Sequence, residues 1–274
     1  MSKKQPIGVF DSGLGGLTIL KEIIRALPDY DYLYLGDNAR TPYGTRSFES
    51  VYHFTLECVK KLFELDCHLI ILACNTASAK ALRTIQQNDL PKLYPDRRVL
   101  GVLRPTTEVV GNYTKTKHIG ILGTSGTVRS NSYPIEIGKF FPDVNVYQQA
   151  CPMWVPLVEN NEHLSDGADY FIQKNIEELL MHSPLIDTIV LGCTHYPLLL
   201  KKILKAIPEN IKVISQNELV ASSLKSYLKR HPEIESNCSK NGGTEFLTTD
   251  STEIFDTHAS AFFGKEVKSN HLQL

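Results

Sequence analysis

Two cysteines occupy matching places in the sequence. Cys74 directly follows the apolar run Leu69–Ala73, and Cys193 follows Thr188–Leu191 by one glycine; each run has the length of a buried strand, and each cysteine precedes a predicted helix. Ligands of open α/β sheets bind at the carboxyl ends of strands. A helix N-terminus stabilises negative charge, so we expect both thiols to have a lowered pKa. A single such cysteine is more often a small buried apolar residue, but two in matching contexts favour chemistry.

Two similar acid–base groups suit one type of reaction in particular. Racemisation at an α-carbon needs a base on one face and an acid on the other, and the roles reverse in the opposite direction. A thiolate and a thiol, from Cys74 and Cys193, satisfy this symmetry. The pattern therefore predicts proton transfer between two sulfurs across one bound carbon.

Polar residues near the predicted strand ends are further candidates for the site. Asp11 and Ser12 precede a glycine-rich turn whose N–H groups can hold a carboxylate, although Asp11 is equally typical of a helix cap. The turn lacks the Gly-Lys-Ser/Thr ending of a phosphate loop and the glycine spacing of a dinucleotide fingerprint. His195 lies two residues after Cys193 and can relay a proton. Glu159 either orients a catalytic group or is a solvated loop residue.

Composition limits the possible partners. The formal net charge is −1, which gives no electrostatic reason to bind nucleic acid or an anionic membrane surface. The apolar runs are too short for a membrane span or a signal peptide, so we expect a cytoplasmic protein. No cysteine and histidine spacing is typical of zinc, and we expect free thiols. We interpret the remaining cysteines as structural: Cys58, Cys67, Cys151 and Cys238.

Strand-like and helix-like segments alternate along the chain, which predicts a parallel α/β fold. The predicted strands are 7–10, 32–35, 69–73, 118–122, 144–148 and 188–191, and the predicted helices are 17–27, 48–65, 77–87, 131–140, 166–182 and 198–206. Residues 39–47 are rich in turn formers. The order repeats weakly: IGVFDSGLGG at 7–16 resembles IGILGTSGTV at 119–128, and LIILACNTAS at 69–78 resembles TIVLGCTHYP at 188–197. We therefore expect two pseudo-symmetric parallel-sheet domains with the active site in the cleft between them.

The motifs resemble those of the glutamate racemase family, in the family's order over most of the chain. The matching pieces are GVFDSGLGGLTIL, YLGDNARTPYGTRS, ILACNTASAKAL, ILGTSGTVRSNSY, ACPMWVPLVE and LGCTHYPLL, with a weaker match at FLTTD. The resemblance implies Cys74 and Cys193 as catalytic acid and base, assisted by Asp11, Glu159 and His195. It implies glutamate contacts at Asp11, Ser12, Tyr43, Gly44, Asn75, Thr76, Thr194 and His195.

The resemblance also implies the setting of the reaction. We expect neither pyridoxal phosphate nor a metal, glutamate as the small-molecule substrate, D-glutamate for peptidoglycan synthesis, and a homodimer. We expect a first domain of residues 1–98 plus 212–274, because the family's chain returns to it, and a second domain of residues 99–211. Two departures put domain packing and regulation in doubt: Arg104 stands within the usual Glu-Pro-Gly segment, and Gln216 stands within the usual Asp-Ser segment.

Three other functions stay open on the sequence alone. An aspartate racemase would share the thiols. A non-catalytic amino-acid-binding clamp would share the cleft without needing two thiols. A cysteine hydrolase would use Cys193 with His195 and would leave Cys74 unexplained.

Overall fold

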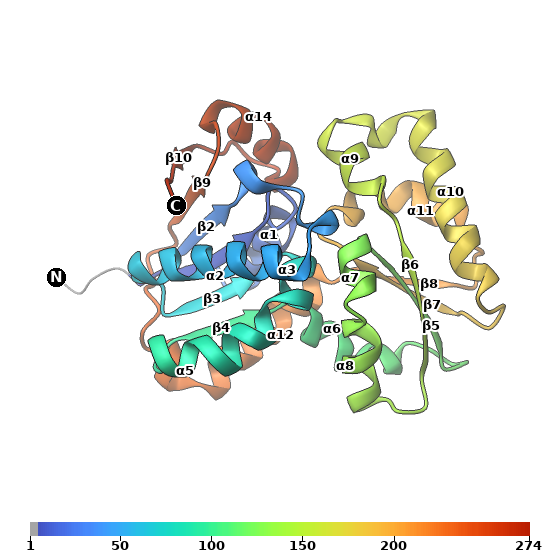
Figure 1. The fold of residues 1–274 in the computed structure, drawn as a ribbon, viewed down its shortest axis with the longest axis horizontal. Coiled ribbons are helices and arrows are strands. Elements are labelled where there is room, and N and C mark those ends of the chain that lie inside the picture. The colour runs from blue at the N-terminus through green and yellow to red at the C-terminus, as the bar shows by residue number, and fades with distance from the viewer. Residues whose placement is uncertain (1–4) are drawn as a thin grey trace.

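Two parallel sheets lie side by side in the computed structural model, which describes residues 5–274 (Figure 1). The larger sheet has the order β10-β9-β2-β1-β3-β4 and the smaller has the order β6-β5-β7-β8, and every pairing is parallel. The strands are β1 Ile7–Asp11, β2 Tyr32–Gly36, β3 Leu69–Leu72, β4 Arg98–Gly101, β5 His118–Gly123, β6 Asn145–Ala150, β7 Thr188–Gly192, β8 Lys212–Ile214, β9 Thr244–Thr248 and β10 Ser269–His271. The predicted α/β class with two parallel sheets is confirmed.

Helices cover both faces of the larger sheet and flank the smaller one (Figure 1). Strands β1, β2 and β3 are buried along their whole length, because a parallel strand between two helical layers has no solvent face. The helices are α1 Leu17–Ala26, α2 Phe48–Glu64, α3 Asn75–Lys80, α4 Leu82–Thr84, α5 Leu90–Leu93, α6 Leu103–Thr107, α7 Ser125–Arg129, α8 Ser132–Phe140, α9 Trp154–Glu159, α10 Asp166–Met181, α11 Leu200–Ala206, α12 Asn217–Arg230, α13 Pro232–Glu235 and α14 Thr252–Phe263.

The helices after the two cysteines differ from their prediction. The helix expected at 77–87 begins at Asn75 and is broken into short pieces, with a π-helical turn at Ile85–Asp89. The helix expected at 198–206 is preceded by a 3₁₀ turn, Tyr196–Leu199. Cys193 therefore does not cap an α-helix, and the two cysteine segments are less alike than the sequence suggests.

The chain crosses between the sheets twice. It leaves the larger sheet after β4, and it returns through α12, which packs against α1. The expected boundary at 212 falls at the start of β8, which pairs with β7 in the smaller sheet. We therefore propose that the second domain extends through Ile214. Residues 1–4 of the expected first domain lie outside the described residues.

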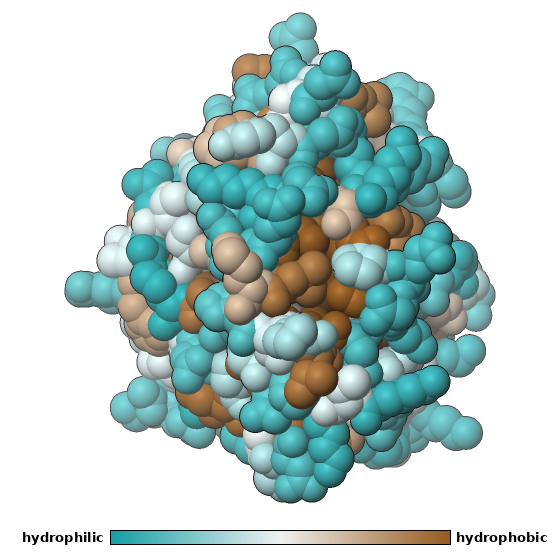
Figure 2. Space-filling model, turned by 90° about the vertical axis from the view of Figure 1, so that its right-hand side faces the viewer, coloured by the Kyte–Doolittle hydropathy of each residue, from teal (hydrophilic) through white to brown (hydrophobic). Residues whose placement is uncertain are grey.

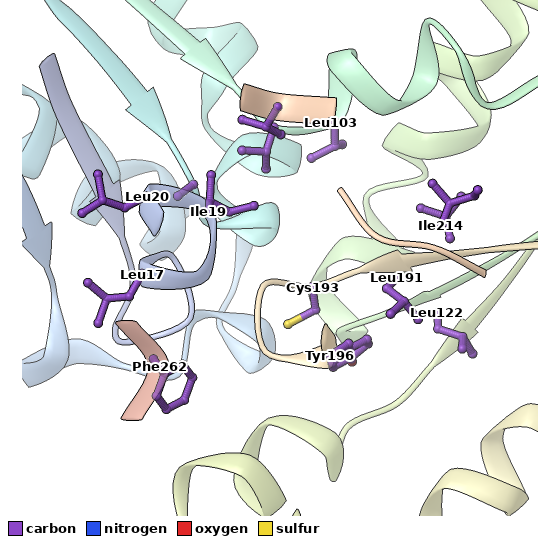
Figure 3. Packing of buried hydrophobic residues seen from close by; sticks show 14 of the residues in the cluster. Leu17, Ile19, Leu20, Leu103, Leu122, Leu191, Cys193, Tyr196, Ile214 and Phe262 are labelled. Carbon is purple, nitrogen blue, oxygen red and sulfur yellow. The ribbon is translucent and has the colours of Figure 1, made fainter. Parts of the chain in front are cut away.

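One buried apolar cluster runs from the larger sheet into the smaller one. It joins side chains of α1, such as Leu17 and Ile19, to Leu191 and Tyr196 in the second domain (Figure 3). A second cluster packs on the opposite face of the larger sheet, under α2. On the side of the molecule formed by α10 and the smaller sheet, hydrophilic side chains surround an apolar area (Figure 2). Within residues 5–274, no helix combines the length and apolarity that a membrane crossing needs.

Candidate active site

A cavity of about 80 Å³ between the two domains is lined by both Cys74 and Cys193. Each of these cysteines is 6% exposed. The sulfur of Cys193 points toward the side on which α1 of the first domain lies (Figure 3). The cavity wall also holds the other predicted site residues except Asp11: Ser12, Tyr43, Gly44, Asn75, Thr76, Glu159, Thr194 and His195.

Cys74 sits at the N-cap of α3. Its sulfur accepts a hydrogen bond from the N–H of Ala77 at 3.4 Å, and its thiol lies 3.4 Å from the hydroxyl of Ser12. An apolar strand that ends just before the helix places this sulfur at the carboxyl edge of the sheet. The N-cap position leaves the sulfur facing the cavity rather than the sheet interior.

The pKa of Cys74 is raised, whereas we expected it to be lowered. Burial is the largest cause, followed by the negative charge of Asp11, and together they raise the pKa to about 12 despite the opposing hydrogen bonds with Ser12 and Ala77. The expectation of a lowered pKa was therefore wrong for this thiol. A short helix of this kind supplies less stabilisation than desolvation removes, so Cys74 rests as a thiol and is suited to act as an acid.

Asp11 is 1% exposed and lies outside the cavity wall. One carboxylate oxygen accepts the N–H of Gly13 at 2.9 Å, and the other has no hydrogen-bond partner within residues 5–274. Burial raises its pKa, and the positive charge of His195 and the N–H groups of Gly13 and Gly16 oppose that rise. A carboxyl group of this kind influences Cys74 through its charge.

The glycine-rich turn after Asp11 packs against the second domain. A Cβ at Gly15 would collide with the side chains of Thr194 and His195, and the hydroxyl of Thr18 donates to the carbonyl of Thr194 at 3.1 Å. Of the turn 12–16, Ser12 lines the cavity. The turn therefore makes a close contact between the domains, and Ser12 is the residue of the turn that faces the cavity.

Cys193 lies beside an imidazole that a carboxylate orients. The Nδ1 atom of His195 is 3.9 Å from the sulfur of Cys193, and its Nε2 atom is 3.1 Å from Oε1 of Glu159. Burial works against the charged form of His195, but its hydrogen bonds to Cys193 and Glu159 outweigh burial and raise its pKa. A protonated imidazole offers the sulfur a hydrogen-bond donor and a positive charge. Glu159 thus orients His195 and lies in the cavity wall, which favours the first of the two interpretations of this residue.

The loop after β2 closes the cavity. The phenol of Tyr43 donates to the buried carboxylate of Asp37, which Arg40 also binds at 2.7 Å. This network holds the 3₁₀ turn Tyr43–Thr45, so the loop is more regular than its turn-rich sequence indicates. A Cβ at Gly44 would lie 2.9 Å from Cβ of Thr124, which shows that the loop backbone lies directly on the second domain.

The cavity wall contains residues that we did not predict. Thr124 and Ser125 belong to the turn that repeats the glycine-rich turn of the first half, and this repeat was the signal for them. Thr124 also caps α7 and lies 3.0 Å from the hydroxyl of Thr76 in the first domain. Cys151, which we interpreted as structural, lines the cavity as well; it follows β6 and lies in the motif ACPMWVPLVE, which was the signal for it.

Two larger hollows lie elsewhere, and no cysteine lines them. One, of about 650 Å³, lies between α10 and α11; the other, of about 710 Å³, is lined from α4, α6, α8 and α12. In the part of the chain that the structure describes, no three side chains of His, Cys, Asp or Glu gather in a way that could hold a metal ion.

Known proteins of similar sequence and structure agree on one family. Residues 7–224 match the Asp/Glu/hydantoin racemase family. The chain is 38% identical to the glutamate racemase of Roseobacter denitrificans, over 96% of this chain and 98% of that one, and 39% identical to that of Geobacter metallireducens, over 94% and 92%. The fold is similar to a glutamate racemase of Bacillus anthracis (TM-score 0.89, 35% identity, 99% and 98% covered). It is also similar to that of Francisella tularensis solved with D-glutamate (TM-score 0.87, 31% identity, 99% and 98% covered).

Proposed function

The chain belongs to the Asp/Glu/hydantoin racemase family and is an isomerase, and from this premise we propose that it interconverts L-glutamate and D-glutamate without a cofactor. The observation that carries the proposal is that Cys74 and Cys193 line one cavity from two different domains. A substrate held there has a thiol on each side, which is what proton removal from one face and delivery to the other require.

The proposed reaction moves one proton and breaks no other bond of the substrate. The thiolate of one cysteine takes the α-proton and becomes a thiol, while the electron pair stays on the carbon. The thiol of the other cysteine gives its proton to the opposite face and becomes the thiolate. The two cysteines exchange protonation states in each turnover, and the reverse reaction or exchange with solvent restores them.

The two thiols have different assistants in this proposal. Asp11 and Ser12 act on Cys74, by charge and by hydrogen bond. His195, held by Glu159, supplies a proton-bearing imidazole beside Cys193. Each domain therefore contributes one complete acid–base unit.

Hydroxyl and amide groups of the cavity wall suit a dicarboxylate. Ser12, Asn75, Thr76 and Thr194 offer neutral donors, and neutral donors satisfy a buried carboxylate without a counter-ion. We propose that they hold the two carboxylates of glutamate together with Tyr43 and Gly44. Asp11 is assigned a role through Cys74 instead of a direct contact.

A cysteine hydrolase is the second candidate, because the sulfur of Cys193 faces Nδ1 of His195. It leaves Cys74 without a role. Mass spectrometry of the protein mixed with a glutamate ester distinguishes them, since a hydrolase forms an acyl adduct on Cys193 and a two-thiol racemase does not.

The direct test of the function is polarimetry of the purified full chain with L-glutamate and no added cofactor. We expect the rotation to decay to zero, and to do so from D-glutamate as well. L-Aspartate and L-glutamine are the comparison substrates, and we expect a much slower decay of the optical rotation with either. Binding of glutamate without decay of rotation would contradict the proposal and favour the clamp, and faster decay with aspartate would favour an aspartate racemase.

The biological setting follows from the same proposal. We propose that the D-glutamate formed supplies peptidoglycan synthesis in the cytoplasm, and that the chain acts as a homodimer. The exposed apolar side chains Tyr170, Met181, Leu185 and Leu204, on or next to α10 and α11, support a protein contact. Light scattering of the purified chain tests whether two copies associate.

A further inference from the structure

Gln216 lies where the two crossings between the domains meet. It follows β8 and begins the return to the first domain, and it is 2% exposed. Its side-chain nitrogen lies 3.3 Å from the carbonyl oxygen of Val102 and 3.2 Å from the hydroxyl of Thr106, both of which belong to the first crossing. The same nitrogen lies 2.6 Å from the hydroxyl of Tyr133 on α8. Gln216 therefore connects the return crossing to two other segments, the first crossing and α8.

The chemistry of these groups fixes the direction of the hydrogen bonds. An amide nitrogen can only donate, so the oxygen of Tyr133 accepts from Gln216. The hydrogen of the Tyr133 hydroxyl is then free for another acceptor, and Oδ1 of Asn75 lies 3.0 Å away. Gln216, Tyr133 and Asn75 thus form a chain of hydrogen bonds in which each hydrogen points toward α3.

These hydrogen bonds determine that the oxygen of the Asn75 amide, and not its nitrogen, faces Tyr133. Because the carbonyl oxygen accepts from Tyr133, the NH₂ group must point elsewhere. That nitrogen is buried and has no hydrogen-bond partner within residues 5–274, and Asn75 lines the cavity next to Cys74. A buried donor without a partner is unfavourable, so the site is incomplete until a ligand supplies an acceptor.

We propose that Gln216 and Tyr133 are positioning residues that hold the Asn75 amide with its NH₂ group as a donor for the substrate. A donor fixed in this way selects a carboxylate oxygen and disfavours an ammonium group at the same place. The inference rests on the proposed function and adds to it the origin of one specificity contact. It also gives a role to Gln216, one of the two departures from the family pattern.

A purely structural role for the network makes a different prediction. If Gln216 only joins the two crossings, then removing its bond to Thr106 should matter as much as removing its bond to Tyr133. If these hydrogen bonds act on the substrate through Asn75, only the bond between Gln216 and Tyr133 should affect substrate affinity. It should do so only while Asn75 is present.

The experiment is a double-mutant cycle measured by racemisation kinetics with both enantiomers. We expect Tyr133→Phe to raise KM about tenfold, equivalent to about 1.4 kcal/mol, with a smaller change in kcat. Gln216→Glu should do the same, because a carboxylate accepts the Tyr133 hydrogen and takes it from Asn75. The matched control Thr106→Val should keep KM within about twofold, and Tyr133→Phe should not raise KM further in an Asn75→Ala background.

Either of two results would overturn the inference: a parental KM in Tyr133→Phe, or the same fold increase with and without Asn75. If Gln216→Glu fails to fold because of its buried charge, the Tyr133→Phe cycle decides alone. A parent chain that does not interconvert the enantiomers refutes the proposed function and this inference with it. A parent chain that racemises glutamate, with variants whose KM is unchanged, refutes only the inference.

Discussion

At the residue scale, the two sulfurs of the cavity are similar in exposure and different in surroundings. Burial is the main cause of the raised pKa of Cys74, and the negative charge of Asp11 adds to it. Cys193 lies beside His195, whose raised pKa keeps a positive charge close to the sulfur. The raised pKa of Cys74 favours the thiol form of this residue.

The pair of His195 and Glu159 leads to a prediction of pH dependence. The pKa of His195 is raised in the folded protein, so its charge contributes stability that is complete below its ordinary pKa of 6.5 and is lost as the pH rises through the raised value. Glu159→Gln removes one cause of the rise. We expect the variant to be less stable than the parent, with the largest loss in free energy of unfolding below pH 6.5. The difference from the parent should shrink at alkaline pH. Urea denaturation from pH 5.5 to 9 measures both.

Glu162→Gln is the matched control, because Glu162 is an exposed glutamate three residues further along. It should change stability by less than about 0.5 kcal/mol at every pH. A Glu159→Gln deficit that grows with pH would show that the imidazole is not stabilised in its charged form.

Residue types predicted which side chains line the cavity better than they predicted its electrostatics. The two cysteines after two apolar runs, and His195 in the Thr-His pair after Cys193, line the same cavity. The pKa of Cys74 was not predictable, because it depends on burial and on Asp11, which is 63 positions away in the sequence. Asn75 was found, but the atoms that orient it lie on α8 and after β8.

At the element scale, the loop between β2 and α2 is positioned from both domains. The carboxylate of Asp37 accepts a hydrogen bond from the phenol of Tyr43. Thr249, which follows β9, donates to the same carboxylate at 2.9 Å. On the other side, Gly44 touches Thr124 at the start of α7. The loop is therefore placed by a segment from the end of the chain and by the second domain together.

The contact at Gly44 gives a prediction about glycine substitutions. Gly44→Ala puts a methyl group 2.9 Å from Cβ of Thr124, closer than carbon atoms approach, so the loop or α7 must shift. We expect kcat/KM for glutamate to fall at least about tenfold, since a displacement of about 1 Å is enough to disturb catalysis strongly.

Gly138→Ala provides the comparison, because Gly138 lies inside α8 and a Cβ there meets no atom within 4 Å. It should leave kcat/KM unchanged and raise the free energy of unfolding by about 0.5–1 kcal/mol. Equal kinetics for Gly44→Ala and the parent would mean that the loop position does not matter for the reaction.

Local sequence patterns predicted the elements around the site unevenly. Apolar runs located β1, β2, β3, β5 and β7 closely, because each is buried on both faces. The break of the helix after Cys74 into α3, α4 and α5 was missed, since no proline or glycine in 75–89 marks it. Strands β9 and β10 were also missed, because β9 is buried only at Phe246 and Thr248, and β10 has three residues of which none is buried.

At the scale of the whole molecule, each domain packs its turn against the cysteine segment of the other. The turn of the first half contacts Thr194 at Gly15, with a further hydrogen bond from Thr18 of α1, and the turn of the second half contacts Thr76 through Thr124. This reciprocal contact is the structural counterpart of the weak repeat in the sequence. It explains why two cysteines 119 positions apart, at 74 and 193, come to line one cavity.

The most direct test of the two-thiol account is hydrogen exchange at the α-carbon of glutamate in D₂O, followed by proton NMR. In Cys74→Ala and Cys193→Ala, one thiol remains on one face, so it can exchange the proton of one enantiomer but cannot complete racemisation. We predict that each variant exchanges a single enantiomer, that the two variants exchange opposite ones, and that neither racemises. Racemisation at near the parental rate by either variant, or exchange of the same enantiomer by both, would contradict the account.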